Sequence, residues 1–214
     1  MISETMQIEM NSPRTLGRTV SVSVLLGLLL VGCGTTTPLD TFNLSAPQPA
    51  VSSPSRRSTQ LLVPTPTALK ALDSENIVVS STPGSIEYLK GAQWGDRLTN
   101  IVQSRLVQAY ENTGVFGGIG RPGDGLAINY QILTDLRMFG IQAYASPKLA
   151  VVELAVKLMN DKNGEVRATR VFRTAIPVSG TTNAAYVKAL DAAFERTASE
   201  IVSWTVTALY TEAR

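Results

Sequence analysis

The only cysteine of the chain follows an apolar segment, in a setting that can direct its chemical modification. Leu30, Val31, Gly32 and Cys33 form a lipobox at the end of the apolar run 20–31, which follows a segment with two arginines. This order of segments, with a small residue before the cleavage point, is typical of a bacterial lipoprotein signal peptide. We therefore expect cleavage after Gly32 and attachment of lipid to the sulfur of Cys33, so that two or three acyl chains anchor the mature protein in a membrane.

Two other interpretations of the segment around Cys33 are weaker. A transmembrane helix needs about 20 predominantly apolar residues, which is more than this run provides. Cysteine is often buried in a core, but a position directly after Leu-Val-Gly favours the lipobox. We therefore expect residues 1–32 to be a signal peptide. Translation from Met10 instead of Met1 would leave a purely basic segment before the apolar run and would give the same mature protein.

The residue types that the chain lacks exclude most catalytic and metal sites. There is no histidine, which excludes Ser-His-Asp and Cys-His catalysis and removes the commonest metal ligand. A single cysteine allows no internal disulfide, and the net charge of +2 is too weak for a nucleic-acid-binding surface. Asp135, Glu153, Asp161 and Glu165 recur at no spacing that brings two carboxylates together. We expect no enzyme activity, no metal and no other cofactor.

A glycine-rich stretch at 114–125 contains a G-x-G-x-x-G pattern at Gly118, Gly120 and Gly123. In a dinucleotide-binding site this pattern follows a strand and opens a helix. Here a predicted helix precedes the glycines and a predicted strand follows them, and Pro122 lies inside the pattern. We therefore interpret the stretch as a loop and not as a nucleotide site.

Composition divides the rest of the chain into a tether and a folded domain. Residues 33–59 are rich in Ser, Thr and Pro, a composition that buries too little surface to offset the entropy of ordering. We expect a tether there, with one edge strand at 41–44, where polar and apolar residues alternate. The folded domain is expected to occupy residues 60–214.

Two hydrophobic periods alternate along the expected domain. A period of 3.6 residues predicts helices at 94–111, with Trp94 and Asp96 in the first turn, and at 183–210. Alternation and turn signals predict one or two helical turns at 67–72 and strands at 61–63, 77–80, 86–89, 126–138, 149–159 and 165–178. Two helices with apolar stripes must bury them on one face of the sheet. We therefore predict an α+β fold, an antiparallel sheet with two helices packed on one face as a two-layer sandwich.

Aromatic residues are spread over these elements: Tyr88, Trp94, Tyr130, Phe139 and Trp204. They could line a groove for an apolar ligand, or they could fill the core beneath the helices. The burial habits of aromatic side chains favour the core. The residues alone therefore indicate a lipid-anchored α+β domain and not an enzyme.

The stretch at residues 87–98, EYLKGAQWGDRL, resembles a motif of the ABC-type transport auxiliary lipoproteins, a family that includes proteins like paraquat-inducible protein C. Gly95 departs from the motif, which has alanine there. Further stretches of the chain resemble the same family: residues 41–47, 67–73 and 135–139. The motif residues that could form either core or a partner-binding face are Tyr88, Trp94, Asp96 and Leu98.

The resemblance implies a role in transport. Such lipoproteins accompany an ABC ATPase, a permease and a mammalian-cell-entry (MCE) substrate-binding protein, which move phospholipids or other hydrophobic molecules across the envelope. We expect an outer-membrane lipoprotein facing the periplasm, because Gly34 replaces the aspartate that retains lipoproteins in the inner membrane of enteric bacteria. It would dock the MCE-domain partner, and a homo-oligomer could form a collar around that partner.

Two alternatives give the protein a different function. A free-standing periplasmic lipid carrier would hold lipid in an apolar cavity of its own. A structural lipoprotein would stabilise an outer-membrane assembly without touching cargo. Bound lipid without a transport partner favours the carrier, and outer-membrane proteins without specific lipid favour the assembly role.

Overall fold

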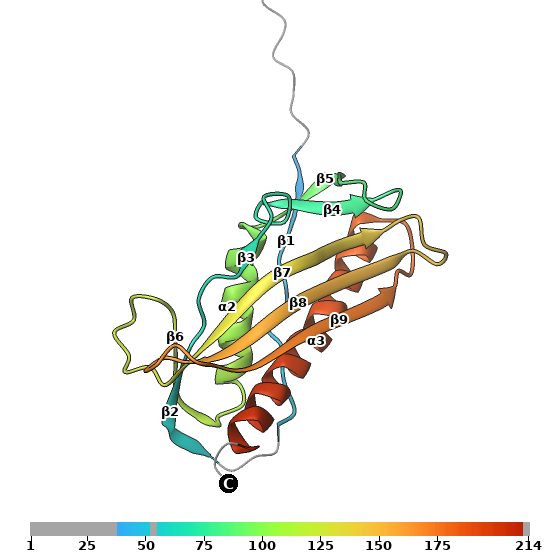
Figure 1. Ribbon diagram of the computed structural model, residues 1–214. Helices are drawn as coiled ribbons and strands as arrows, with labels where there is room; N and C mark the ends of the chain where they lie inside the picture. Colours follow the sequence, from blue (N-terminus) through green and yellow to red (C-terminus); the bar gives the residue numbers. More distant parts are fainter. Residues whose placement is uncertain (1–37, 52–54, 212–214) are drawn as a thin grey trace, which may run out of the picture. The chain divides into compact units, whose positions relative to one another are not determined.

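The computed structural model of the chain describes residues 38–51 and 55–211. The expected signal peptide and the lipobox, including the lipid attachment site at Cys33, lie outside the described residues. From Pro38 onward the chain forms one unit. Within its described residues, nine strands make a single sheet and two helices cover it (Figure 1).

The two helices of the described chain are α2 at Leu98–Glu111 and α3 at Asn183–Thr211. The strands that precede α2 are β1 at Asp40–Phe42, β2 at Arg56–Leu62, β3 at Thr67–Ala68, β4 at Asn76–Ser80 and β5 at Glu87–Trp94. Those between the helices are β6 at Phe116–Gly120, β7 at Tyr130–Gln142, β8 at Leu149–Asn160 and β9 at Val166–Pro177. Both helices lie behind the long strands in Figure 1, on the same face of the sheet.

The sheet combines antiparallel hairpins with parallel pairings. Strands β7, β8 and β9 form an antiparallel meander, and β4 and β5 form an antiparallel hairpin. In contrast, β2, β3 and β4 each run parallel to β7, β1 runs parallel to β5, and β2 runs parallel to β6. The α+β class is confirmed, but the sheet is mixed, so the prediction of an antiparallel sheet is wrong. Turn residues between two adjacent strands predict an antiparallel hairpin, whereas two parallel strands are joined by a long connection that has no such turn signal.

The middle strand β8 shows how the sheet divides into an inner and an outer face. Leu154, Val156 and Leu158 are fully buried in the core, against which α3 packs, whereas the alternate residues Glu153 and Lys157 lie on the outer face. This alternation follows from the period of two in a strand. The inner face and the buried stripe of α3 therefore form one hydrophobic core.

Strand β7 buries inward-facing side chains along its whole length because its register with β8 shifts once. Ile132 and Leu136 are buried on one parity, and Phe139 and Ile141 are buried on the other. The irregularity lies between Leu136 and Met138 in the pairing with β8. A bulge of this kind adds one residue to a strand and redirects the side chains that follow it. The added residue, Arg137, is on the surface beside two depressions described below.

The helix expected at 94–111 begins later, at Leu98, so its predicted first turn is wrong. Trp94 is the last residue of β5, and its backbone N–H donates to the carbonyl of Glu75 at 2.7 Å. Gly95 donates in the same way to the carbonyl of Phe42, at 2.7 Å. These partners hold residues 94–95 in extended pairing. Trp94 at the end of β5 and Leu98 at the start of α2 both face the core. Their spacing of four residues is also that of one face of a helix, so the sequence pattern resembles a single longer helix.

Two short segments also differ from the sequence prediction. Residues 116–120 of the glycine-rich stretch form strand β6, parallel to β2, where a loop was expected. Residues 67–68 form strand β3 beside β7, where helical turns were expected. In both places the backbone partners come from strands far away in the chain, so the local composition carries no sign of them.

The folded unit begins before residue 60, inside the segment expected to be a tether. Strand β1 at Asp40–Phe42 overlaps the edge strand expected at 41–44. Leu44 is buried, Ser45 donates through its backbone N–H to the Asp191 carboxylate at 2.7 Å, and the carbonyl of Pro47 accepts from Asn112 at 2.9 Å. The segment thus lies along α3 and α2, which supply partners that its composition does not reveal.

Candidate functional site

The motif stretch is distributed between the core and the surface. Trp94 and Leu98 are each only 1% exposed, and the Trp94 ring meets Phe139 edge to face with centroids 5.8 Å apart. Asp96 is exposed at the start of α2, where its Oδ1 accepts from the backbone N–H of Arg97 at 2.6 Å. Tyr88 is also exposed, on β5. Two of the four motif residues therefore pack inside the domain, and the other two face solvent.

Two stretches that resemble the family meet at Asp73. Its carboxylate accepts from the Thr99 hydroxyl at 2.6 Å and from the Arg97 guanidinium, whose Nε is 3.1 Å away. The hydrogen bond from Thr99, followed by that from Arg97, lowers the pKa of Asp73 below its usual range. Hydrogen bonds to the charged form favour that form. The contact therefore fastens the turn after β3 to the first turn of α2, which is a structural role.

The described residues offer little support for chemistry in the interior. The Tyr110 hydroxyl lies 2.8 Å from Thr205 Oγ1, and burial raises the pKa of Tyr110. Thr197 donates to Thr174 at 2.9 Å in the same buried layer. These pairs satisfy polar groups where α3 meets α2 and β9. Among residues 38–51 and 55–211, no group of three or more acidic or cysteine side chains could hold a metal ion.

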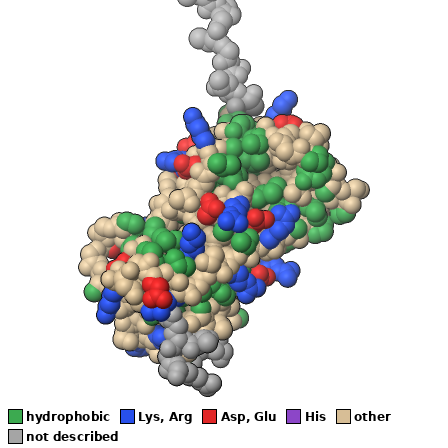
Figure 2. All heavy atoms as spheres, viewed as in Figure 1, with side chains coloured by type: hydrophobic (Ala, Val, Ile, Leu, Met, Phe, Trp, Pro, Cys, Tyr) green, Lys and Arg blue, Asp and Glu red, His purple; other side chains and the backbone are tan. Residues whose placement is uncertain are grey.

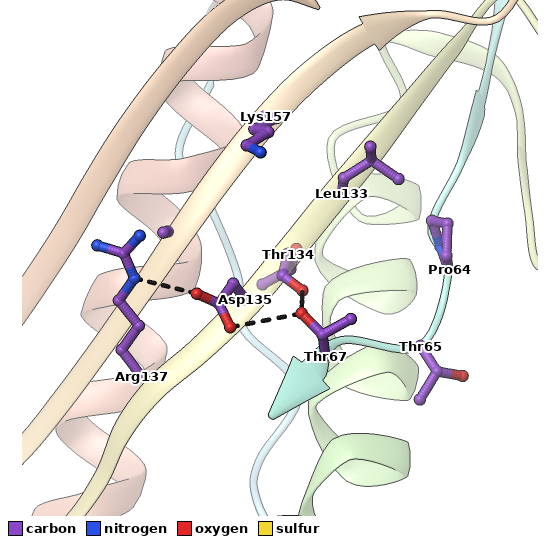
Figure 3. A pocket seen from close by; sticks show the side chains of 9 residues that line it. Pro64, Thr65, Thr67, Leu133, Thr134, Asp135, Arg137 and Lys157 are labelled. Atoms are coloured by element: carbon purple, nitrogen blue, oxygen red, sulfur yellow. Dashed lines mark hydrogen bonds and ion pairs between the residues drawn. The ribbon is translucent and has the colours of Figure 1, made fainter. Parts of the chain in front are cut away.

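The outer face of the sheet carries a band of ion pairs over a shallow depression of about 420 Å³. Figure 3 shows Asp135 between Arg137 and Thr67, with Lys157 on the neighbouring strand. Arg137 Nε lies 3.1 Å from the Asp135 carboxylate, and a second pair, Arg173 with Glu153, also measures 3.1 Å. Exposed pairs of this kind contribute about 0–1 kcal/mol each. The band is therefore a polar, solvated surface.

An apolar groove of about 330 Å³ lies beside this band, between the turn after β3, the β4–β5 hairpin and the end of β7. Its exposed walls are Leu69, Ile86 and Tyr144, which are 76%, 58% and 44% exposed. Phe139 and Met138 form part of its floor. In Figure 2, hydrophobic side chains gather above the band of charges, toward the β4–β5 end. Clustered exposed apolar side chains often mark an interaction site.

The sequence alone predicts only part of this surface. Trp94 and Phe139 are buried in the core, as their burial habits predict, whereas Tyr130 and Trp204 are half-buried. The groove residues Leu69, Ile86 and Tyr144 were not singled out as a site. The available signal was Ile86, two residues after the Pro83-Gly84 turn of the β4–β5 hairpin, because connecting segments usually run over the surface.

Fold and surface together define a class: a small α+β domain with a mixed sheet, two helices on one face and an exposed apolar groove. Within the described residues, no helix is long and apolar enough to cross a membrane. The chain belongs to the family of ABC-type transport auxiliary lipoprotein components, whose model matches residues 42–202. Membership indicates a protein of the cell envelope.

Known relatives agree with this assignment. The uncharacterized protein bll6063 of Bradyrhizobium diazoefficiens is 32% identical over 190 residues, which cover 87% of this chain and 50% of that protein. The chain thus spans about half the length of this relative. The crystal structure of protein XCC0632 from Xanthomonas campestris matches with a TM-score of 0.72 and 30% identity, covering 83% of this chain and 99% of that one.

A more distant structure shares the fold alone. The hypothetical protein CT253 from Chlamydia trachomatis matches with a TM-score of 0.51 and 6% identity, covering 72% of this chain and 99% of that one. At 6% identity this likeness shows the fold alone. The family match gives the coarse role, an auxiliary lipoprotein component of ABC-type transport.

Proposed function

We propose that the protein is an outer-membrane lipoprotein, acylated at Cys33 and facing the periplasm, that acts as the docking component of an ABC transporter of the MCE type. Its partners are an MCE-domain substrate-binding protein and the permease and ATPase of the same system. The cargo is phospholipid or another hydrophobic molecule, and self-association into a collar is part of the proposal. The observation that carries it is the family match over residues 42–202, which includes the motif stretch 87–98.

The size of the groove argues against a free-standing lipid carrier. Pockets that enclose a small molecule have volumes of about 300–1,000 Å³. The groove, at about 330 Å³, lies at the lower end of this range and is open along the surface. A carrier must shield whole acyl chains from water, and an open groove of this size does not do so.

The decisive experiment is a crosslinked pull-down of the lipidated protein from its native membrane, with proteins and lipids both identified. Recovery of an MCE-domain protein with its permease and ATPase is the expected result. The Cys33→Ser variant, which lacks the acylated sulfur, serves as the matched control and should recover far less of these partners. Abundant lipid without such partners would favour the carrier, and outer-membrane proteins alone would favour an assembly role.

The outer-membrane location has its own test. Gly34→Asp should move the protein from outer-membrane to inner-membrane fractions on a density gradient, because an aspartate after the acylated cysteine retains lipoproteins in enteric bacteria. Gly34→Ser, which adds a small neutral side chain, is the control and should leave the distribution unchanged. An unaltered distribution of the aspartate variant would contradict sorting at this position.

A further inference from the structure

Exposed large hydrophobic side chains concentrate at one end of the described domain. Five of the eight that are exposed belong to the β1–β5–β4 end and the loops beside it. Three of them line the apolar groove, and two lie on or next to the neighbouring strands β5 and β1. We call this set the apolar end, and its members are Leu39, Leu69, Ile86, Tyr88 and Tyr144.

The chain enters the domain at the same end. Strand β1 begins at Asp40, directly after Leu39, and pairs with β5. Only seven residue steps separate Asp40 from Cys33. A fully extended chain of that length reaches at most about 25 Å. An acylated Cys33 therefore keeps the start of β1, and with it the apolar end, close to the bilayer surface.

The opposite end of the domain is held at a greater distance. Helix α3 begins beside β5, where Asn183 donates to the carbonyl of Lys90 at 3.1 Å. Its last turn lies at β2, where Arg56 donates to the carbonyl of Leu209 at 2.7 Å. A helix of 29 residues is about 43 Å long. The connection between Cys33 and β1 is thus shorter than helix α3. Because the connection joins the domain at β1, the end of the domain that contains β1 is the one that lies near the membrane.

The chemistry of the apolar end suits a lipid surface. Two of its five members are tyrosines, which prefer the interface between hydrocarbon and water because the ring is apolar and the hydroxyl polar. The exposed charges nearby are balanced, with Lys70, Lys90, Arg97 and the groove residue Arg137 opposed by Asp40, Glu75, Glu87 and Asp96. Contact with lipid would therefore be hydrophobic and only weakly dependent on salt or on anionic lipid.

We propose that the apolar end lies in the headgroup region of the bilayer that holds the acyl chains of Cys33. The domain then contacts the membrane at two places, through the acyl chains and through the apolar end. This inference depends on the acylation that forms part of the proposed function. The anchor raises the effective concentration of the apolar end at the surface, so a patch too weak to bind vesicles alone is sufficient. The outer face of the sheet then stays free for protein partners.

The test uses the full acylated protein in vesicles of zwitterionic phospholipid. Acylation blocks the native sulfur, so a single introduced cysteine carries an environment-sensitive fluorophore. Ile86→Cys places the label at the apolar end, and Val171→Cys is the matched control, because Val171 is an exposed β-branched residue on β9 outside this end. Both side chains are exposed, and thermal unfolding of each variant verifies its fold.

The expected result is that the label at residue 86 is quenched by brominated lipid and protected several-fold from aqueous iodide, whereas the label at residue 171 shows the reverse. Equal access of iodide to both labels would overturn the inference. Protection at residue 86 that persists in detergent and rises with protein concentration would also overturn it, because a second copy would then cover the apolar end.

Failure of the proposed function gives a different pattern. Mass spectrometry of the N-terminal peptide shows whether Cys33 is acylated, and an unmodified cysteine would remove the premise of both proposals. Lipid contact at residue 86 in a protein that recovers no transport partners would leave this inference standing and reject the transport role.

Discussion

The core beneath the helices and the apolar end are built from the same kinds of side chain, but only the core surrounds them with neighbours. Trp94 and Phe139 are each 1% exposed and pack edge to face, whereas Ile86 and Tyr88, in the same strand region, are about half exposed. The motif stretch contributes to both regions. Burial therefore separates residues that hold the fold from residues available for contacts, and substitutions should affect the two regions differently.

The largest effect is expected in the core. Trp94→Ala should lower the free energy of unfolding by about 3–5 kcal/mol, because it removes a fully buried ring and leaves a cavity against Phe139. Tyr88→Ala, in the same strand, should change it by no more than about 0.5 kcal/mol, because that ring is exposed. Denaturant titration measures both values. Similar losses for the two variants would break the distinction between core and surface in β5.

The second-largest loss of stability is expected in strand β6, where the sequence predicts a loop. A Cβ at Gly117 would lie 1.8 Å from the backbone carbonyl oxygen of Arg57 in β2, whereas a Cβ at Gly118 would meet only the Gln60 side chain at 3.6 Å. Gly117→Ala should therefore destabilise the protein by about 1–3 kcal/mol through overpacking. Gly118→Ala should be near neutral, and equal behaviour in thermal unfolding would contradict the close pairing of β2 and β6.

A smaller effect is expected at Asp73, on the boundary between core and surface. Asp73→Asn should cost about 1 kcal/mol at neutral pH, because the carboxylate is partly exposed and accepts hydrogen bonds from two side chains, those of Arg97 and Thr99. The pKa of Asp73 is lowered in the folded state. Its contribution is therefore present above the unfolded pKa of about 3.9 and is lost as the pH falls through the folded value.

Unfolding measured across pH, with Asp40→Asn as the exposed control, should show the difference between wild type and Asp73→Asn shrinking in acid. The control should show a much smaller trend, because Asp40 is exposed and, among the residues that the structure describes, its side chain makes no hydrogen bond that ties two elements together. A difference that stays constant down to low pH would show that the Asp73 charge contributes nothing to stability.

The smallest effect on stability is expected at the apolar end. Ile86→Ser should change the free energy of unfolding by no more than about 0.5 kcal/mol, because the side chain is already in water in the isolated domain. A loss of well over 1 kcal/mol would place Ile86 in the core and remove the contrast on which the lipid contact depends. Thermal and denaturant unfolding of the protein in detergent supply this measurement.

Local signals predicted much of the fold. The Asn163-Gly164 turn predicts the β8–β9 hairpin, and the Pro83-Gly84 turn predicts the β4–β5 hairpin. The 3.6-residue period predicts α3 almost to its ends. The parallel pairings of β1 with β5 and of β2 with β6 are not marked by a turn that joins the two partners directly. The sequence predicts an edge strand at 41–44 and a strand at 61–63 but not their partners, and it predicts a loop where β6 forms, because the groups that order these segments lie elsewhere in the chain.

The candidate surface was harder to predict than the fold. Its members come from residues 39, 69, 86, 88 and 144, which no motif or period connects. Tyr88 was selected by resemblance and Trp94 by periodicity, but only the folded sheet places Leu69, Ile86 and Tyr144 around one groove. A surface assembled by long-range pairing cannot be read from local sequence.

Strand β9 is twelve residues long and pairs with β8 alone among the described strands, so one of its edges is open. An open edge can template another chain and lead to aggregation. Three arginines, at positions 167, 170 and 173, recur along this strand. Arg167 and Arg173 are paired with Glu165 and Glu153, and two copies meeting edge to edge would have to order and partly desolvate these long charged side chains, which opposes their pairing. If the protein is anchored as we propose, its copies collide often in two dimensions, and this cost helps to keep neighbouring molecules from joining their sheets into one.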